Sequence, residues 1–114
     1  MKILKHYPDQ LTNKLKYDLT MSPKTQKMQN ADGSVIEISA WAIYTDTDKD
    51  DTERTVLCIR NLEGETFATN SATFIRDFER LLDLFDAAGL TAVEVISGTS
   101  KSGRRYLTCA YAGE

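Results

Sequence analysis

Asn70–Gly89, with the sequence NSATFIRDFERLLDLFDAAG, contains the strongest helical pattern in the chain. Its apolar side chains recur at the spacing of one face of an α-helix. Asn70 or Ser71 is a suitable N-cap, and Gly89 is of the type that ends helices. This face must be buried, because each large apolar side chain contributes roughly 1.5–3 kcal/mol when it leaves water. The apolar face consists of Phe74, Ile75, Phe78, Leu81, Leu82 and Phe85.

The segments on either side of this helix are predicted to be strands, because apolar and polar side chains alternate along them. Three strands precede the helix and two follow it, at 35–45, 54–61, 65–69, 92–97 and 104–112. This order is that of the OB-fold, a five-stranded Greek-key barrel with one helix. We therefore predict a mainly β, OB-fold-like five-stranded barrel over residues 31–114. Another small α+β sheet also fits the same order.

The first 30 residues differ from the rest, because they are polar, rich in lysine and only weakly periodic. Leu11, Leu15 and Leu19 are four residues apart, which favours a short helix near residues 9–19. We predict that residues 1–30 form an N-terminal arm outside the barrel.

Length and composition indicate one globular domain, with 41% hydrophobic and 27% charged residues in 114. No apolar run has the length of a membrane span, and the N-terminus does not resemble a signal peptide. We therefore expect a cytoplasmic protein. The net charge of −3 is unevenly distributed: residues 1–28 carry +4, residues 29–98 carry −9 and residues 99–114 carry +2. A uniformly basic nucleic-acid binder is excluded, whereas a basic arm and a basic C-terminal hairpin on an acidic body are compatible with this pattern.

The first predicted strand has two faces of different character. Alternation places Ile36, Ala42 and Tyr44 on the face expected to enter the core. Trp41 falls on the other, more polar face. Together with Tyr106 and Phe67, it could form a surface on which bases stack. The alternative is that Trp41 fills the core between barrel and arm, since large aromatic side chains are usually mostly buried.

The acidic segment 46–51, DTDKDD, is predicted to be a hairpin turn. Its spacing resembles a calcium loop, but Asp51 stands at the position that requires glycine and Leu57 at the position of the bidentate glutamate. A solvated turn fits better, so we predict no metal site. Cys58 and Cys109 lie inside predicted strands and are interpreted as buried thiols.

The segment GTSKSGRRY at 98–106 joins the last two strands and combines three cations with an aromatic ring. Lys101, Arg104 and Arg105 could neutralise phosphates, and Tyr106 lies beside them. In an OB-fold this loop is one of two that usually contact oligonucleotides. The alternative is an ordinary charged hairpin that protects a sheet edge. The chain shows no catalytic histidine, GxSxG or Cys–His arrangement, so we expect neither enzymatic activity nor a cofactor.

Three segments resemble the small single-stranded DNA-binding proteins of tailed phages of Gram-positive bacteria, including phages with protein-primed replication. They are GSVIEISAWAIY, ATNSATFIRDFERLLDLF and VISGTSKSGRRYLTCAYA, and the resemblance covers roughly residues 24–112. It implies cooperative coating of single strands during phage DNA replication, in the host cytoplasm. It also implies binding by Lys101, Arg104, Arg105 and Tyr106, and more weakly by Trp41 and Tyr44. The acidic first turn departs from this expectation.

The leading hypothesis is therefore a viral, non-sequence-specific single-stranded DNA-binding protein. Lys24 and Lys27 of the arm and the last hairpin would contact phosphates, while aromatic rings stack on bases. Self-association into a homo-oligomer is compatible with this function. The alternative is a small phage or mobile-element protein that binds a host defence or replication protein through its acidic surface.

Overall fold

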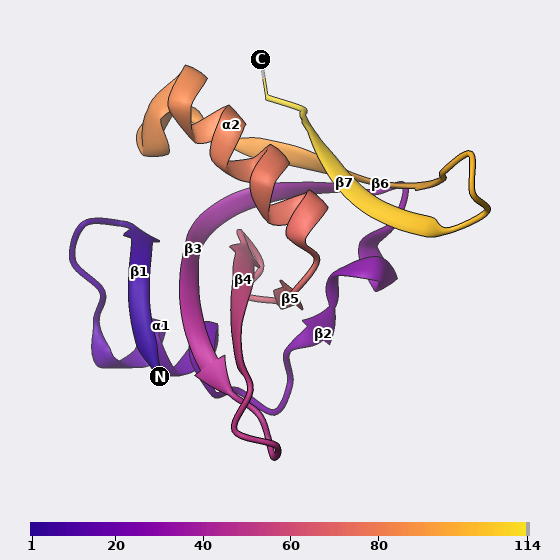
Figure 1. The fold of residues 1–114 in the computed structure, drawn as a ribbon. Coiled ribbons are helices and arrows are strands. Elements are labelled where there is room, and N and C mark those ends of the chain that lie inside the picture. The colour runs from indigo at the N-terminus through magenta and orange to yellow at the C-terminus, as the bar shows by residue number, and fades with distance from the viewer. Residues whose placement is uncertain (114) are drawn as a thin grey trace.

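The computed structural model describes residues 1–113, which fold around one strongly curved sheet (Figure 1). Within these residues the structure is mainly β, with two α-helices and one 3₁₀ turn, η1. The elements in chain order are β1 (Lys2–Tyr7), α1 (Asn13–Thr20), β2 (Gln26–Lys27), η1 (Met28–Ala31), β3 (Val35–Thr47), β4 (Glu53–Asn61), β5 (Thr66–Thr69), α2 (Ala72–Gly89), β6 (Ala92–Thr99) and β7 (Arg105–Tyr111).

Strand β3 is the centre of the sheet. Along one edge its first residues pair with β6 and its last residues pair with β1, while its other edge pairs with β4. Strand β5 continues from β4, and β7 continues from β6, all antiparallel. Because β3 bends between its two sets of partners, the sheet curls into a half-barrel (Figure 1).

The five strands and the helix predicted from residue 35 onward are present in the predicted order. The five-stranded count is wrong, because β1 and β2 join the same sheet. Within residues 1–113 no strand pairing connects β5 with β7, where a closed barrel would have its last contact. Residues 26–34 bridge this opening instead: β2 pairs with β5 in parallel, and Gly33 N–H donates to the Val95 carbonyl at 2.8 Å.

Helix α2 confirms the prediction made from its apolar pattern. Ser71 is the N-cap, and its hydroxyl oxygen accepts a hydrogen bond from the Phe74 N–H at 3.2 Å. Phe74, Ile75 and Phe78 are buried against the concave side of the sheet. The later residues of the face, Leu81, Leu82 and Phe85, are only partly buried. The hydroxyl of Thr108 donates to the carboxylate of Asp77, which attaches α2 to β7.

The burial of Trp41 corrects the predicted faces of the first strand. A register irregularity lies between Ile38 and Ala40, so the alternation changes phase near Ser39. Ile36 and Trp41 therefore face the same core, and Trp41 is only 2% exposed. Its indole packs edge-to-face on Phe78 with 5.3 Å between ring centroids. The interpretation of Trp41 as a surface platform does not fit this structure. Trp41 is a core residue, but the core that it enters is the one beneath α2 and not a space between the sheet and helix α1.

The N-terminal residues also depart from the prediction, because they are integrated into the fold. The short helix is present as α1, and Leu19 packs with Ala42 and Cys58 on the face of the sheet opposite α2. Strand β1 pairs with β3 over Lys2–Tyr7. The predicted arm is thus part of the same sheet and core.

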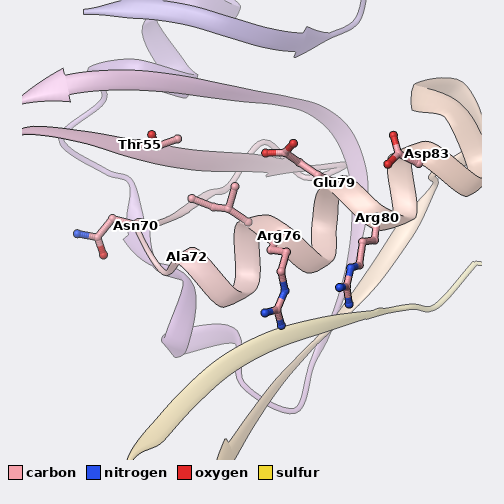
Figure 2. Close-up of a pocket in the computed structure, with 8 residues that line it drawn as sticks. Thr55, Asn70, Ala72, Arg76, Glu79, Arg80 and Asp83 are labelled. Carbon is pink, nitrogen blue, oxygen red and sulfur yellow. The ribbon is translucent and has the colours of Figure 1, made fainter.

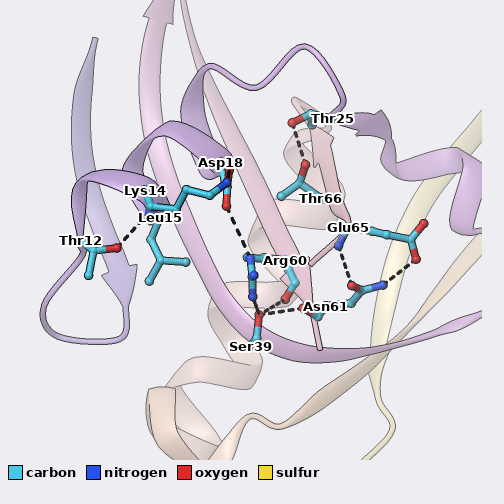
Figure 3. A network of polar contacts seen from close by, with 10 residues as sticks. All are labelled: Thr12, Lys14, Leu15, Asp18, Thr25, Ser39, Arg60, Asn61, Glu65 and Thr66. Atoms are coloured by element: carbon cyan, nitrogen blue, oxygen red, sulfur yellow. Dashed lines mark hydrogen bonds and ion pairs between the residues drawn. The ribbon is translucent and has the colours of Figure 1, made fainter. Parts of the chain in front are cut away.

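A polar network fastens α1 to the strands (Figure 3). The Arg60 guanidinium donates to the Ser39 hydroxyl at 2.8 Å and lies 3.8 Å from the Asp18 carboxylate. Ser39 in turn donates to the Asn61 carbonyl at 2.8 Å, beside the register irregularity. The network therefore connects α1, β3 and β4 at the point where β3 changes phase.

Both cysteines are buried and unbonded to each other, as predicted. Burial raises the pKa of the Cys58 and Cys109 thiols to about 12, so both stay protonated at neutral pH. No helix in the described part of the chain is long and apolar enough to cross a membrane.

Candidate nucleic-acid interface

A groove made of two adjoining hollows lies beside β4 and β5 and reaches the opening between β5 and β7. It consists of two hollows, of about 480 and 660 Å³, that share Gln29, Thr69 and Asn70. Lys27, Tyr44 and Arg54 line the first hollow. The first turn of α2 and the start of β7 line the second. We call this combined feature the seam groove.

The charged residues that line the seam groove are three cations and one carboxylate. Lys27, Arg54 and Arg105 are exposed, and within residues 1–113 none of them forms an ion pair. Asp46 is the carboxylate and is the cross-strand neighbour of Arg54. The groove therefore carries a local positive excess on a protein whose net charge is negative.

The start of α2 adds to this positive character. Ser71 and Thr73 line the groove, so the first turn of α2 lies along it. N–H groups in a first helical turn lack partners within the helix, and the helix dipole places partial positive charge there. Both effects favour an anion such as a phosphate group.

Two tyrosines line the seam groove, one in each hollow. Tyr44 is almost entirely buried but contributes to the wall of the first hollow. Burial raises the pKa of its phenol to about 12, so its hydroxyl remains able to donate a hydrogen bond. Tyr106 lines the second hollow and is 43% exposed. An exposed ring next to the cation Arg105 suits a nucleic-acid base followed by its phosphate.

The segment 26–34, which contributes Lys27 and Gln29 to the groove, is held to β6 by a carboxylate that does not itself line the groove. The two Asp32 oxygens accept hydrogen bonds from the Ser97 N–H at 2.9 Å and from the Ser97 hydroxyl at 2.6 Å. The hydrogen bonds from Ser97 hold the pKa of Asp32 below its ordinary value, with a smaller contribution from Arg105. Asp32 is thus a latch between the segment 26–34 and β6.

We expect Asp32→Asn to have a lower melting temperature than the wild type at neutral pH. Because the folded-state pKa is lowered, the stabilisation is present above the ordinary pKa of 3.8 and is lost as the pH falls through the folded value. The difference between the two proteins should therefore shrink in strong acid. Thermal unfolding followed by circular dichroism between pH 7 and 3 tests this. Asp50→Asn in the exposed β3–β4 turn is the matched control. If the melting temperatures of both variants differed from the wild type with the same pH dependence, the stabilising role of Asp32 would be contradicted.

A third hollow, of about 610 Å³, runs along α2 and meets the groove at Asn70 (Figure 2). Arg76 and Arg80 extend from one side of the helix and Glu79 from the other (Figure 2). The two arginines lie 3.3 and 3.9 Å from the Asp77 carboxylate. Since acidic side chains offset its cations, this hollow suits phosphates less well than the seam groove.

The structure brings together four of the nine residues predicted to bind nucleic acid: Lys27, Tyr44, Arg105 and Tyr106 line the seam groove. Lys101 and Arg104 are exposed in the adjoining β6–β7 turn. Lys24 lines a different hollow, beside Arg60. Phe67, like Trp41, belongs to the core, at 8% exposure. These two rings are therefore corrected from predicted surface residues to core residues.

The groove is also lined by four residues that no sequence pattern marks as binding residues: Arg54, Gln29, Thr69 and Asn70. Arg54 follows an acidic turn, which hid it within a segment of opposite charge. For Asn70, the sequence predicts only a role as a helix cap. Gln29 and Thr69 carry no pattern of their own, and only the pairing of β2 with β5 places them together.

The acidic β3–β4 turn is organised as a hairpin tip. One Asp48 carboxylate oxygen accepts hydrogen bonds from the N–H groups of Asp50 and Thr52. Within the part of the chain that the structure describes, no group of three or more histidine, cysteine or acidic side chains is arranged to hold a metal ion.

Comparisons of the chain with protein-family models, curated proteins and solved structures found no match.

Proposed function

We propose that the protein binds single-stranded DNA, without sequence preference, in the seam groove. The observation that supports this proposal is that two adjoining hollows share three residues and together are lined by the exposed ring of Tyr106 and by three cations that form no ion pair within residues 1–113. Single-strand binders commonly combine a positive groove for the backbone with aromatic rings for the bases. Lys27, Arg54 and Arg105 would contact phosphates, while Tyr106 and the edge of Tyr44 would contact bases.

An OB-fold-like architecture is part of the proposal. From β3 onward, the order of elements and the pairings β3–β4–β5, β3–β6 and β6–β7 suit a partly open Greek-key barrel. OB-folds bind oligonucleotides on the face of their second and third strands and on the loops after the first and fourth. Here these correspond to β4, β5, the acidic turn and the β6–β7 turn. The seam groove includes residues of β4 and β5 and reaches the start of β7.

The phage setting follows from the resemblance in sequence alone, and we propose it with the function. A phage or mobile-element protein of this kind would cover single strands exposed during DNA replication. Several copies would then occupy one strand, which makes a homo-oligomer on DNA compatible with the proposal.

The test is a titration of the 114-residue chain with a fluorescently labelled oligo(dT) at several salt concentrations, followed by fluorescence anisotropy. We expect affinity to fall with a logarithmic slope near −0.7 for each phosphate neutralised. Because Trp41 is buried, we expect little direct quenching of its fluorescence by the bound strand. A protein that does not bind oligo(dT) even at low salt would contradict the proposal.

The acidic turn favours a second candidate function, the binding of a host protein. The β3–β4 hairpin projects from the body of the sheet, and Asp50, Asp51 and Glu53 are exposed there (Figure 1). This candidate would be supported by a host protein that binds the wild-type chain in a nuclease-treated lysate. The same host protein should no longer bind the double variant Asp50→Asn, Asp51→Asn. Binding of oligo(dT) that survives the same two substitutions would support the seam groove.

A further inference from the structure

The ring of Tyr106 lies directly over a glycine on the neighbouring strand. Gly98 and Tyr106 are cross-strand partners in the β6–β7 pair. A methyl group added at residue 98 would overlap the hydroxyl oxygen of Tyr106 and would lie 2.5 Å from its Cζ and 2.9 Å from its Cε1, so the hydroxyl end of the ring covers this glycine. The aromatic ring therefore occupies the space that any side chain at residue 98 would need.

The backbone does not explain why residue 98 is glycine. Gly33, Gly64 and Gly103 have positive φ angles, whereas Gly98 does not. Glycine inside a strand normally weakens the strand, and it often marks a place where another group approaches closely. Here the approaching group is the Tyr106 ring, which remains 43% exposed beside Arg105 in the seam groove.

We propose that Gly98 is a positioning residue that lets the Tyr106 ring lie close against the backbone of β6, so that the exposed part of the ring stacks on one base of the bound strand. This inference rests on the proposed function and deepens it. The ring contributes base contact and the neighbouring Arg105 contributes phosphate contact. A ring that lies against the backbone of β6 is also held in place before the DNA binds, which reduces the ordering cost of binding.

The test compares two probes of equal length: oligo(dT), and an abasic oligomer that keeps the sugar–phosphate backbone without bases. We expect Gly98→Ala to weaken oligo(dT) binding by roughly 5- to 100-fold, the loss typical of one stacked base. Tyr106→Leu should produce the same loss, and combining the two should add no further loss. Neither substitution should change the affinity for the abasic oligomer, because the ring contacts only bases.

Gly113→Ala is the matched control, since a methyl group there would also overlap a tyrosine, Tyr111, outside the seam groove. It should leave binding of both probes unchanged. Circular dichroism confirms folding, and Tyr106→Leu carries the test if Gly98→Ala does not fold. Equal weakening of both probes would overturn the inference, as would oligo(dT) binding unaffected by the substitution used. A wild-type protein that binds neither probe would instead overturn the proposed function, and this inference with it.

Discussion

Replacing Phe78 with alanine is expected to lower the free energy of unfolding by about 3–5 kcal/mol, the range for a buried aromatic side chain in a packed core. Phe78 is fully buried at the centre of the apolar face of α2. Its ring also contacts the edge of Trp41, so the substitution removes an aromatic pair as well as apolar area. Single domains have stabilities of about 5–15 kcal/mol. One substitution should therefore remove a large share of the total.

Urea unfolding measures this loss, with circular dichroism for the backbone and Trp41 fluorescence for the core. The denaturation midpoint should fall while the dependence on urea stays constant, because the folded state remains equally compact. Leu84→Ala is the matched control on the same helix, since Leu84 is 74% exposed. We expect it to change stability by no more than about 0.5 kcal/mol. Similar losses in the two variants would mean that α2 does not pack through the Phe78 face.

The largest expected effect on binding follows from removing the three cations of the seam groove together. Substitution of Lys27, Arg54 and Arg105 by alanine should reduce the logarithmic salt slope for oligo(dT) by about 2, at 0.7 for each lost phosphate contact. At 0.1 M salt this corresponds to roughly 100-fold weaker binding. The three residues lie on β2, β4 and β7, so only a groove that crosses these strands predicts that they act together.

The control for this variant removes the same charge from elsewhere. Lys2, Lys16 and Lys24 are exposed and do not line the seam groove, so their joint substitution by alanine changes the net charge equally. This control variant should bind oligo(dT) only slightly more weakly than the wild type, because it changes only the overall electrostatic potential of the protein. If both triple variants lose the same slope, attraction depends on total charge and the seam groove is not the site.

Most of the secondary structure could be predicted from the sequence, because helices and strands depend on the periodicity of apolar side chains within a short segment. The period of the α2 face and the alternation in β6 and β7 are encoded by neighbouring residues, and these elements lie close to their predicted bounds. The β6–β7 turn was predictable for the same reason. Strand β1 was not, because its lysine-rich sequence acquires strand structure by pairing with residues about 40 positions away.

The candidate site was predictable only in part. Arg105 and Tyr106 could be predicted as binding residues, because several cations precede an aromatic residue within one short segment of the sequence. Arg54 and Asn70 have no such neighbours, and they become groove residues only because β4, β5 and the start of α2 converge. Trp41 was predicted to be at the surface, because strict alternation along the strand places it on the more polar face. The register irregularity near Ser39 reverses the alternation, so its side chain lies in the core.

Local patterns in the chain are enough to predict the identity and order of the main elements, the apolar face that packs α2 onto the sheet and the basic turn between β6 and β7. These depend on residues close together in the chain, whose periodicity and turn chemistry act locally. Four features are set only in the folded chain: the phase of β3, the integration of residues 1–30, the segment that links β5 with β6 and the adjacency of the two hollows of the seam groove. Each of these depends on long-range pairing and burial, which bring together side chains that no local pattern connects.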